Sequence, residues 1–373
     1  MYFYIVFTLV LLIPICLPYN RISDFTMEKK KEVSLAVSML MILLVSGLRA
    51  ITVGADSRQY ASAYDQLKIL SIKKALSVPI WSWNGTYTYS LEFGYRIYNK
   101  MVAFFFDSNQ AILFFNSLII VILLYNLIRR NSPYYGLSIW LYITLGFFQT
   151  EMNMARNAMA ILFCLNAIEC IYKRELFKYI LLVLLASTFH TSALLFIPLY
   201  WVINYIELTP RRIKIFALLS VVVGLLGQQV YYFLLIFVPS RYLHYMILAE
   251  SETEGTALVF LFIGVFLLIW FFCDEKYDVD SFISIDNAGA WLFILMVFSF
   301  SISRSINAFT RVAALFSPYL IIYFPEMICY GISNKWVRRI IVVTLVVGLF
   351  GVYVYRLSIN NIGQTIPYHF FLG

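Results

Sequence analysis

Long apolar stretches alternate with short polar segments along most of the chain. A membrane-spanning helix needs roughly 20 mostly apolar residues, and the chain offers about twelve stretches near that length. They cover residues 2–18, 33–53, 110–128, 134–148, 154–172, 177–189, 192–206, 213–238, 256–273, 288–303, 312–332 and 340–356. Backbone groups in lipid must be satisfied within the segment, and the runs lack the alternation of barrel strands. The pattern therefore predicts an all-α, polytopic integral membrane protein, with residues 1–373 forming a single transmembrane domain.

The longest segment between apolar stretches covers residues 54–107. Connections beyond about 12 to 15 residues are usually functional or disordered, so this one is expected to do more than join two helices. It starts with a polar sequence at 54–60 and contains an aromatic cluster around Trp81 and Trp83. It ends in an amphipathic stretch, 97–106, which predicts a helix lying at the membrane interface.

Lysine and arginine gather in alternate short loops, which marks those loops as cytoplasmic. This orientation predicts that both termini and the long segment 54–107 lie outside. The weak break at His190 also falls at the outer level. It is compatible with either a tight outer turn or one bent helix.

Composition supports the membrane assignment and excludes other classes. Hydrophobic residues make up 62% of the chain and charged residues 13%, against about 25% charged in soluble domains. The net charge of +8 is divided among loops, which argues against nucleic-acid binding. The five cysteines show no metal-binding or disulfide pattern, and no P-loop or dinucleotide motif occurs. We therefore expect no metal and no cofactor, and an already activated substrate.

Several arginines stand beside apolar stretches on the predicted external side. They are Arg49, Arg58, Arg96, Arg156, Arg241, Arg304 and Arg311. Arginine is a planar, always-charged donor suited to phosphate and carboxylate, and charged residues near membrane spans are functional candidates by default. The set indicates an anionic, membrane-borne substrate that is handled outside the cytoplasm.

Three titratable side chains on the external side are candidates for acid–base chemistry. Asp56 lies close to Arg49 and Arg58, although it could instead cap a helix that begins near Ser57. Glu92 could equally form a local ion pair with a neighbouring arginine. His190 is suited to proton transfer near neutral pH, but a single histidine is often a hydrogen-bonded core residue.

Other candidates would bind substrate. Arg304 and Arg311 are seven residues apart, which would place them on one face of a continuous helix. Trp81 and Trp83 could stack on sugar rings or belong to an interfacial aromatic belt, and the belt is the simpler interpretation.

Four segments resemble motifs of one protein family. Arg49–Tyr60 resembles the R-x(4)-G-x-D-x-x-x-Y segment of the EpsG family of polysaccharide polymerases, which are relatives of the Wzy repeat-unit polymerases. The sequence Glu92-Phe-Gly-Tyr resembles the family's E-x-G-[FY]. Met154-Ala-Arg-Asn-Ala-Met-Ala resembles x-x-R-[QN]-x-x-A, and Phe189-His-Thr-Ser-Ala-Leu resembles F-H-x-S-A-L. The segments follow one another in the family's order between residues 49 and 194.

The resemblance implies a reaction and a location. The substrate would be an oligosaccharide repeat unit on polyprenyl (undecaprenyl) pyrophosphate, displayed outside the bacterial inner membrane. The enzyme would move the growing glycan from one polyprenyl pyrophosphate to the next unit, with a flippase and a chain-length regulator as partners. The candidate catalytic residues are Asp56, Glu92, Arg156 and His190. The candidate substrate-binding residues are Arg49, Arg58, Tyr60, Trp81, Trp83, Arg304 and Arg311.

Two other functions remain as alternatives at this stage. A membrane glycosyltransferase that uses polyprenyl-phosphate sugars would share an external site, but it usually starts with an acidic outer first loop. Here the first loop, 20–32, is basic and is expected to be cytoplasmic. A flippase or exporter of lipid-linked oligosaccharide should carry charges along a path through both leaflets, whereas the charges here are biased outward.

Overall fold

The computed structural model describes residues 1–15, 24–86, 88–208, 253–273, 287–303 and 308–371, with separate residues between 212 and 233. Within this part of the chain helices dominate, and the only strands are the short β1 (Ile80–Trp81) and β2 (Thr88–Tyr89). Four helical segments are long and apolar enough to cross a membrane: Gln110–Asn131, Ala155–Tyr172, Phe309–Gly331 and Lys335–Asn360. The expected all-α membrane class is confirmed, and the larger number of spans stays a prediction. Arg241 and Arg304 lie outside the described residues.

The chain divides into two compact units. The first contains Met1–Tyr200 and Val346–Gly373, and the second contains Trp201–Leu345. The sequence showed no boundary of this kind, because both units are built from similar apolar helices. All residues of the candidate site described below belong to the first unit.

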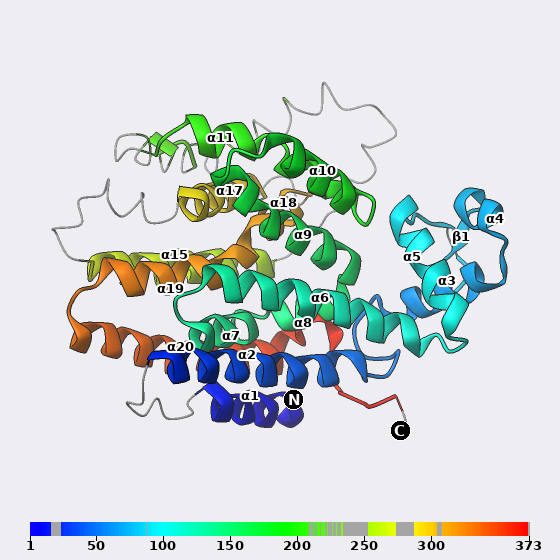
Figure 1. Ribbon diagram of the computed structural model, residues 1–373, viewed down its shortest axis with the longest axis horizontal. Helices are drawn as coiled ribbons and strands as arrows, with labels where there is room; N and C mark the ends of the chain where they lie inside the picture. Colours follow the sequence, from blue (N-terminus) through cyan, green and yellow to red (C-terminus); the bar gives the residue numbers. More distant parts are fainter. Residues whose placement is uncertain are drawn as a thin grey trace. The chain divides into compact units, whose positions relative to one another are not determined.

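The first unit is a bundle of apolar helices (Figure 1). Its members are α1 (Tyr2–Ile15), α2 (Asp24–Gly47), α6 (Gln110–Asn131), α7 (Tyr135–Thr144), α8 (Phe147–Asn153), α9 (Ala155–Tyr172) and α10 (Leu176–Ser187). Helix α2 packs on α6, α6 on α9 and α9 on α10. Apolar side chains such as Leu124 and Leu162 are fully buried between them. This packing fixes α9, whose first turn carries Arg156.

The described residues of the segment 54–107 form a folded layer, whereas the sequence predicted a long external loop with one helix, at 97–106. It contains α3 (Ser57–Ile69), α4 (Ile72–Ser77), the β1–β2 hairpin and α5 (Phe93–Phe105), gathered near one end of α6 in Figure 1. The expected helix at 97–106 is the later part of α5, which already begins at Phe93. Arg96 holds the layer together, since its Nη1 donates to Ala75 O at 2.9 Å and to Val78 O at 2.8 Å.

A late segment of the chain pairs with the start of this layer. It includes η3 (Ile362–Gln364) and follows α20 (Lys335–Asn360). Ala50 N donates to His369 O at 2.8 Å, and Gly54 N donates to Gln364 O at 3.0 Å. Gly54 has a φ of +94°, a conformation that glycine adopts without strain. The turn that leads to Asp56 is therefore held by residues far away in the sequence.

The second unit is also helical. It contains α15 (Thr253–Phe271), α17 (Asn287–Ser303), α18 (Ala308–Phe316), η2 (Ser317–Tyr319) and α19 (Leu320–Gly331), and the division of the sequence into units falls within α11 (Leu199–Tyr205). Helix α17 packs on α15, α18 and α19. Arg311 is exposed on α18.

Candidate active site

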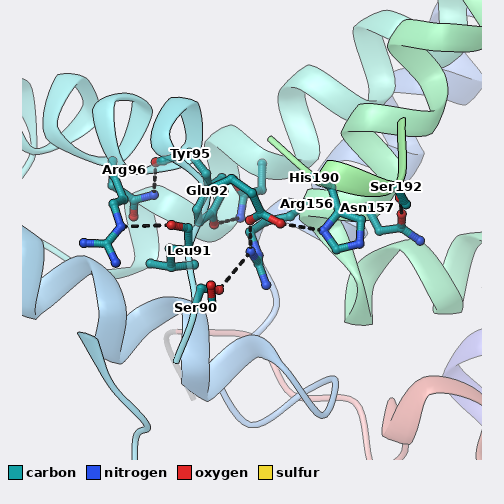
Figure 2. A network of polar contacts seen from close by, with 11 residues as sticks. Ser90, Leu91, Glu92, Tyr95, Arg96, Arg156, Asn157, His190 and Ser192 are labelled. Carbon is teal, nitrogen blue, oxygen red and sulfur yellow. Dashed lines mark hydrogen bonds and ion pairs between the residues drawn. The ribbon is translucent and has the colours of Figure 1, made fainter. Parts of the chain in front are cut away.

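The carboxylate of Glu92 contacts both Arg156 and His190 (Figure 2). Its Oε1 lies 3.0 Å from His190 Nδ1, and its Oε2 accepts a hydrogen bond from Arg156 Nη1. The Glu92 and Arg156 side chains are 15% and 11% exposed, while that of His190 is 32% exposed. The two charged groups are thus largely withdrawn from solvent, and the imidazole is the most accessible member of the cluster.

Each of the three residues stands at the end of a helical element. Glu92 immediately precedes α5, Arg156 lies in the first turn of α9, and His190 immediately precedes η1 (Thr191–Phe196). The packing of these elements therefore fixes the positions from which the three side chains extend. The sequence left open whether His190 marks a turn or a bend. The structure shows a turn, because the backbone of His190 is extended between α10 and η1.

The turn after α10 is joined directly to the start of α5. Thr188 O accepts hydrogen bonds from Gly94 N at 2.9 Å and from Tyr95 N at 3.2 Å. These two donors belong to the first turn of α5, where backbone N–H groups have no partner within the helix. A Cβ atom on Gly94 would lie 2.1 Å from Thr188 Oγ1, so only glycine allows this approach. The contact places Glu92 within reach of His190.

The start of α9 forms further links to neighbouring segments. Ser192 Oγ donates to Asn157 Oδ1 at 3.1 Å, and Asp56 N donates to Asn153 Oδ1 at 2.9 Å. The guanidinium of Arg156 also lies over the ring of Tyr95, 5.7 Å from its centroid. Segments from four separate parts of the sequence therefore meet around one helix terminus.

Local charges decide the protonation state of Glu92. Burial alone would raise the pKa of this carboxyl, but the hydrogen bond to His190 and the positive charge of Arg156 outweigh burial and lower the pKa below its usual value. Glu92 is therefore ionised near neutral pH and can only accept hydrogen bonds. His190 must then carry its proton on Nδ1, which leaves Nε2 as the basic nitrogen.

Comparison with known proteins identifies the family of the chain. A family model described as "EpsG family" matches residues 32–370, which is nearly the whole chain. The chain belongs to the EpsG family. Membership gives it a general role in polysaccharide polymerisation, with lipid-linked saccharides as the substrate class. No curated protein matches the chain, and no solved structure does.

The segments that resemble EpsG-family motifs contain further residues of the site, beyond the candidates named from the sequence. Gly94, Tyr95, Asn157 and Ser192 stand at defined positions in the three later motifs. Gly94 and Tyr95 contact Thr188, Tyr95 also contacts Arg156, and Asn157 and Ser192 contact each other. The position of these four residues in the motifs was the sequence signal that could have identified them as part of the site. The backbone carbonyl of Thr188 left no signal, because any residue type supplies a carbonyl.

The first EpsG-family motif lies beside this cluster. Helix α3 begins at Ser57, as expected, but Asp56 forms no side-chain capping hydrogen bond and is half-buried. Tyr60 is 1% exposed, and its ring centroid lies 5.9 Å from that of Tyr95. The motif therefore contacts the cluster of Glu92, Arg156 and His190, here called the Glu92 cluster, by way of Tyr60 and Tyr95. The backbone of Asp56 links the motif to Asn153, just before α9.

Arg49, the first residue of that motif, is fully buried. Its Nη2 donates to Met152 O at 2.9 Å and its Nη1 donates to Ser117 Oγ at 3.2 Å. It also lines a cavity of about 10 Å³, large enough for one water molecule, together with Glu151. Arg49 thus ties α2 and α6 to the chain just before α9, and its expected substrate contact stays a prediction.

Trp81 and Trp83 expose their rings on a fixed backbone. Each side chain is 52% exposed. Gln66 Oε1 accepts from Trp81 N at 2.9 Å, and Gln59 Oε1 accepts from Trp83 N at 3.0 Å. Arg58 is exposed and lies over the Trp83 ring, 5.3 Å from its centroid. The exposed rings of Trp81 and Trp83 are therefore accessible to a ligand.

The site has no metal-binding arrangement in the described residues. No group of three or more His, Cys, Asp or Glu side chains able to hold a metal ion occurs in that part of the chain.

The candidate Arg311 belongs to the second unit.

Proposed function

We propose that this EpsG-family protein transfers a growing glycan from polyprenyl pyrophosphate to the next lipid-linked repeat unit at the external face of the bacterial inner membrane. One observation carries the proposal: a single carboxylate, Glu92, binds an arginine 64 residues away and a histidine 98 residues away. The cluster pairs a cation suited to a leaving phosphate with a base suited to an attacking hydroxyl.

Arg156 would act on the donor. The bond that breaks joins the anomeric carbon to a pyrophosphate oxygen, and the electron pair leaves with the pyrophosphate. Arg156 and the N-terminus of α9 both favour negative charge at this position, so they would stabilise the leaving group. Because the pyrophosphate ester is already activated, the reaction needs no nucleotide.

His190 would act on the acceptor. With Nδ1–H donated to Glu92, Nε2 can remove the proton from an acceptor hydroxyl as its oxygen bonds to the anomeric carbon. Glu92 orients the imidazole and stabilises its protonated form, which is the part a carboxylate plays beside a catalytic histidine. Asp56, at the start of α3, would orient a sugar hydroxyl near the start of α9.

The exposed surface of α3 and the hairpin would bind the glycan. Trp81 and Trp83 present flat apolar rings of the kind that stack on pyranose rings. Arg58, stacked on Trp83, adds a positive charge beside them. Tyr60 would position the cluster indirectly, because its ring packs on Tyr95, which in turn contacts Arg156.

The proposal is tested in membranes supplied with lipid-linked repeat units, by measuring the ratio of polymer to single-repeat glycan. His190→Ala and Asp56→Asn should each lower polymerisation by about 10²-fold, the usual effect of losing an acid or base. His369→Ala is the matched control, because this histidine is exposed and its backbone carbonyl makes its contact with Ala50. A normal amount of polymer from the His190→Ala variant would show that His190 is not the catalytic base.

Cells that carry the same variants separate the proposed reaction from transport. A defective polymerase still displays single repeat units on the cell surface, because these units have already crossed the membrane. Loss of single units as well as polymer would instead support the flippase alternative.

A further inference from the structure

A wide apolar groove runs between α4 and α5, away from the Glu92 cluster. It has a volume of about 740 Å³ and is lined mainly by Leu70, Ile72, Leu76, Ile97, Met101 and Phe104. The opposite face of α5 buries Tyr95, Asn99 and Val102 against the protein. Helix α5 therefore has one face that belongs to the fold and one that the fold leaves open.

The walls of the groove are unusually exposed for apolar side chains. Ile72, Met101, Phe104 and Phe105 are 67%, 62%, 82% and 75% exposed. A contiguous apolar surface of this kind marks a binding site for a protein, a ligand or a membrane.

The position of the groove along the chain favours the membrane. Helix α5 ends at Phe105, and the membrane-spanning candidate α6 begins at Gln110. Five residue steps cover at most about 18 Å, so the end of α5 lies close to the external end of a span. The exposed phenylalanines are therefore held near the level at which the chain enters the bilayer.

Positive charge accompanies the apolar surface. Lys100 lines the groove, where its Nζ donates to Lys68 O at 2.9 Å and to Leu70 O at 2.7 Å. Lys73 and Lys74 follow Ile72 on α4 and are exposed. The nearby acid Asp107 is paired with Lys68 at 3.1 Å. The surface thus combines a hydrocarbon-sized groove with an excess of lysine.

We propose that the α4–α5 groove binds an anionic phospholipid of the outer leaflet. One acyl chain occupies the groove, and the phosphate lies near Lys100 and the lysines of α4. Lysines close to an anionic membrane surface attract it strongly enough to select anionic lipid over neutral lipid. Glu92 precedes the same helix, about 14 Å from Met101 at 1.5 Å per residue, so the bound lipid would set the height of the Glu92 cluster above the bilayer.

The occupant can be identified by photo-crosslinking in the full-length protein. A photo-reactive phenylalanine analogue replaces Phe104 in one variant and Asn84, an exposed residue of the hairpin, in the control. Both are placed in nanodiscs of equal phosphatidylglycerol and phosphatidylcholine with a few per cent polyprenyl phosphate, and adduct masses are measured. We expect phospholipid adducts at position 104, several-fold fewer at position 84, and phosphatidylglycerol in excess.

The lysines are tested in the same experiment. Lys73→Gln combined with Lys74→Gln should lower the ratio of phosphatidylglycerol to phosphatidylcholine adducts by about fivefold or more. Polyprenyl adducts at position 104, equal labelling at both positions, or an unchanged lipid ratio in the lysine variant would each overturn the proposal. Lipid adducts can be measured in a variant without polymerase activity, so this result is independent of the proposed reaction.

Discussion

Glu92 divides its two carboxylate oxygens between partners of different kinds. One oxygen contacts a permanently charged guanidinium, and the other contacts a group that gains and loses a proton. Its lowered pKa follows from these two partners despite burial. Among the three acid–base candidates, Glu92 is therefore suited to orientation, and His190 is suited to proton removal.

The lowered pKa of Glu92 predicts a dependence of stability on pH. A carboxyl whose pKa is lower in the folded protein stabilises it above the unfolded pKa, near 4.5, and loses this effect as the pH falls through the folded pKa. The wild type should be more thermostable than Glu92→Gln at pH 7, and the difference should shrink as the pH falls below about 4.5. Thermal unfolding in detergent measures this, and a difference independent of pH would contradict the lowered pKa.

Replacing Arg156 by lysine tests whether polymerisation requires the planar guanidinium group. Arg156→Lys retains one charge but loses the donor fork and the broad contact with Tyr95, so polymerisation should fall by about 10²-fold. Arg129→Lys is the control, because Arg129 is 50% exposed in a surface ion pair with Glu32. The polymer-to-single-repeat ratio is compared at equal protein levels in the membrane. A wild-type ratio in the Arg156→Lys variant would show that polymerisation requires the positive charge at this position and not the guanidinium shape.

At the scale of elements, the site depends on one contact between the start of α5 and the turn after α10. The two donors at Gly94 and Tyr95 share the Thr188 carbonyl, which brings two elements together without a side-chain interaction. This explains how Glu92 and His190 meet although they lie on different elements.

Gly94→Ala should disturb this contact. The added methyl group would lie 2.1 Å from Thr188 Oγ1 and 2.6 Å from Thr188 Cβ, so the two elements must separate. Overpacking of this kind costs about 1–3 kcal/mol, and we expect a lower melting temperature and a loss of polymerisation. Thr188→Gly should restore part of both. The matched control is Gly348→Ala on α20, where an added Cβ meets no atom within 4 Å.

The elements were partly predictable from the sequence. Apolar runs give helices reliably in a membrane, and the motifs identified Glu92, Arg156 and His190 one by one. Their meeting was not predictable, because it depends on a backbone carbonyl and on packing between distant segments. Arg49 shows the opposite limit: the sequence placed it beside an apolar stretch as a substrate-binding candidate, and its contacts with Ser117 and Met152 lie inside the bundle.

At the scale of the whole molecule, family membership and the apolar helices establish a membrane protein of polysaccharide biosynthesis. The orientation rests on the positive-inside rule. It determines whether the folded layer 54–107 faces the lipid-linked units outside, so it is the first property of the intact protein to verify.

Cysteine labelling in intact cells tests the orientation. In a variant without native cysteines, Thr86→Cys should react with an impermeant thiol reagent, whereas Lys173→Cys should react only after the cells are permeabilised. Both positions are exposed, so accessibility within the protein does not distinguish them. The reverse labelling pattern would place the Glu92 cluster in the cytoplasm and would contradict the proposed reaction.

The pairing of residues 363–371 with residues 48–55 has a consequence for synthesis. All four motifs have been synthesised once residue 194 is made, yet the turn before Asp56 still lacks the Gln364 and His369 carbonyls that hold it. A chain that stops between these points would carry every motif, but the turn before Asp56 would lack its two carbonyl partners. Assembly of the site is therefore a late event in biogenesis, and nonsense mutations far downstream of the motifs should be as damaging as those within them.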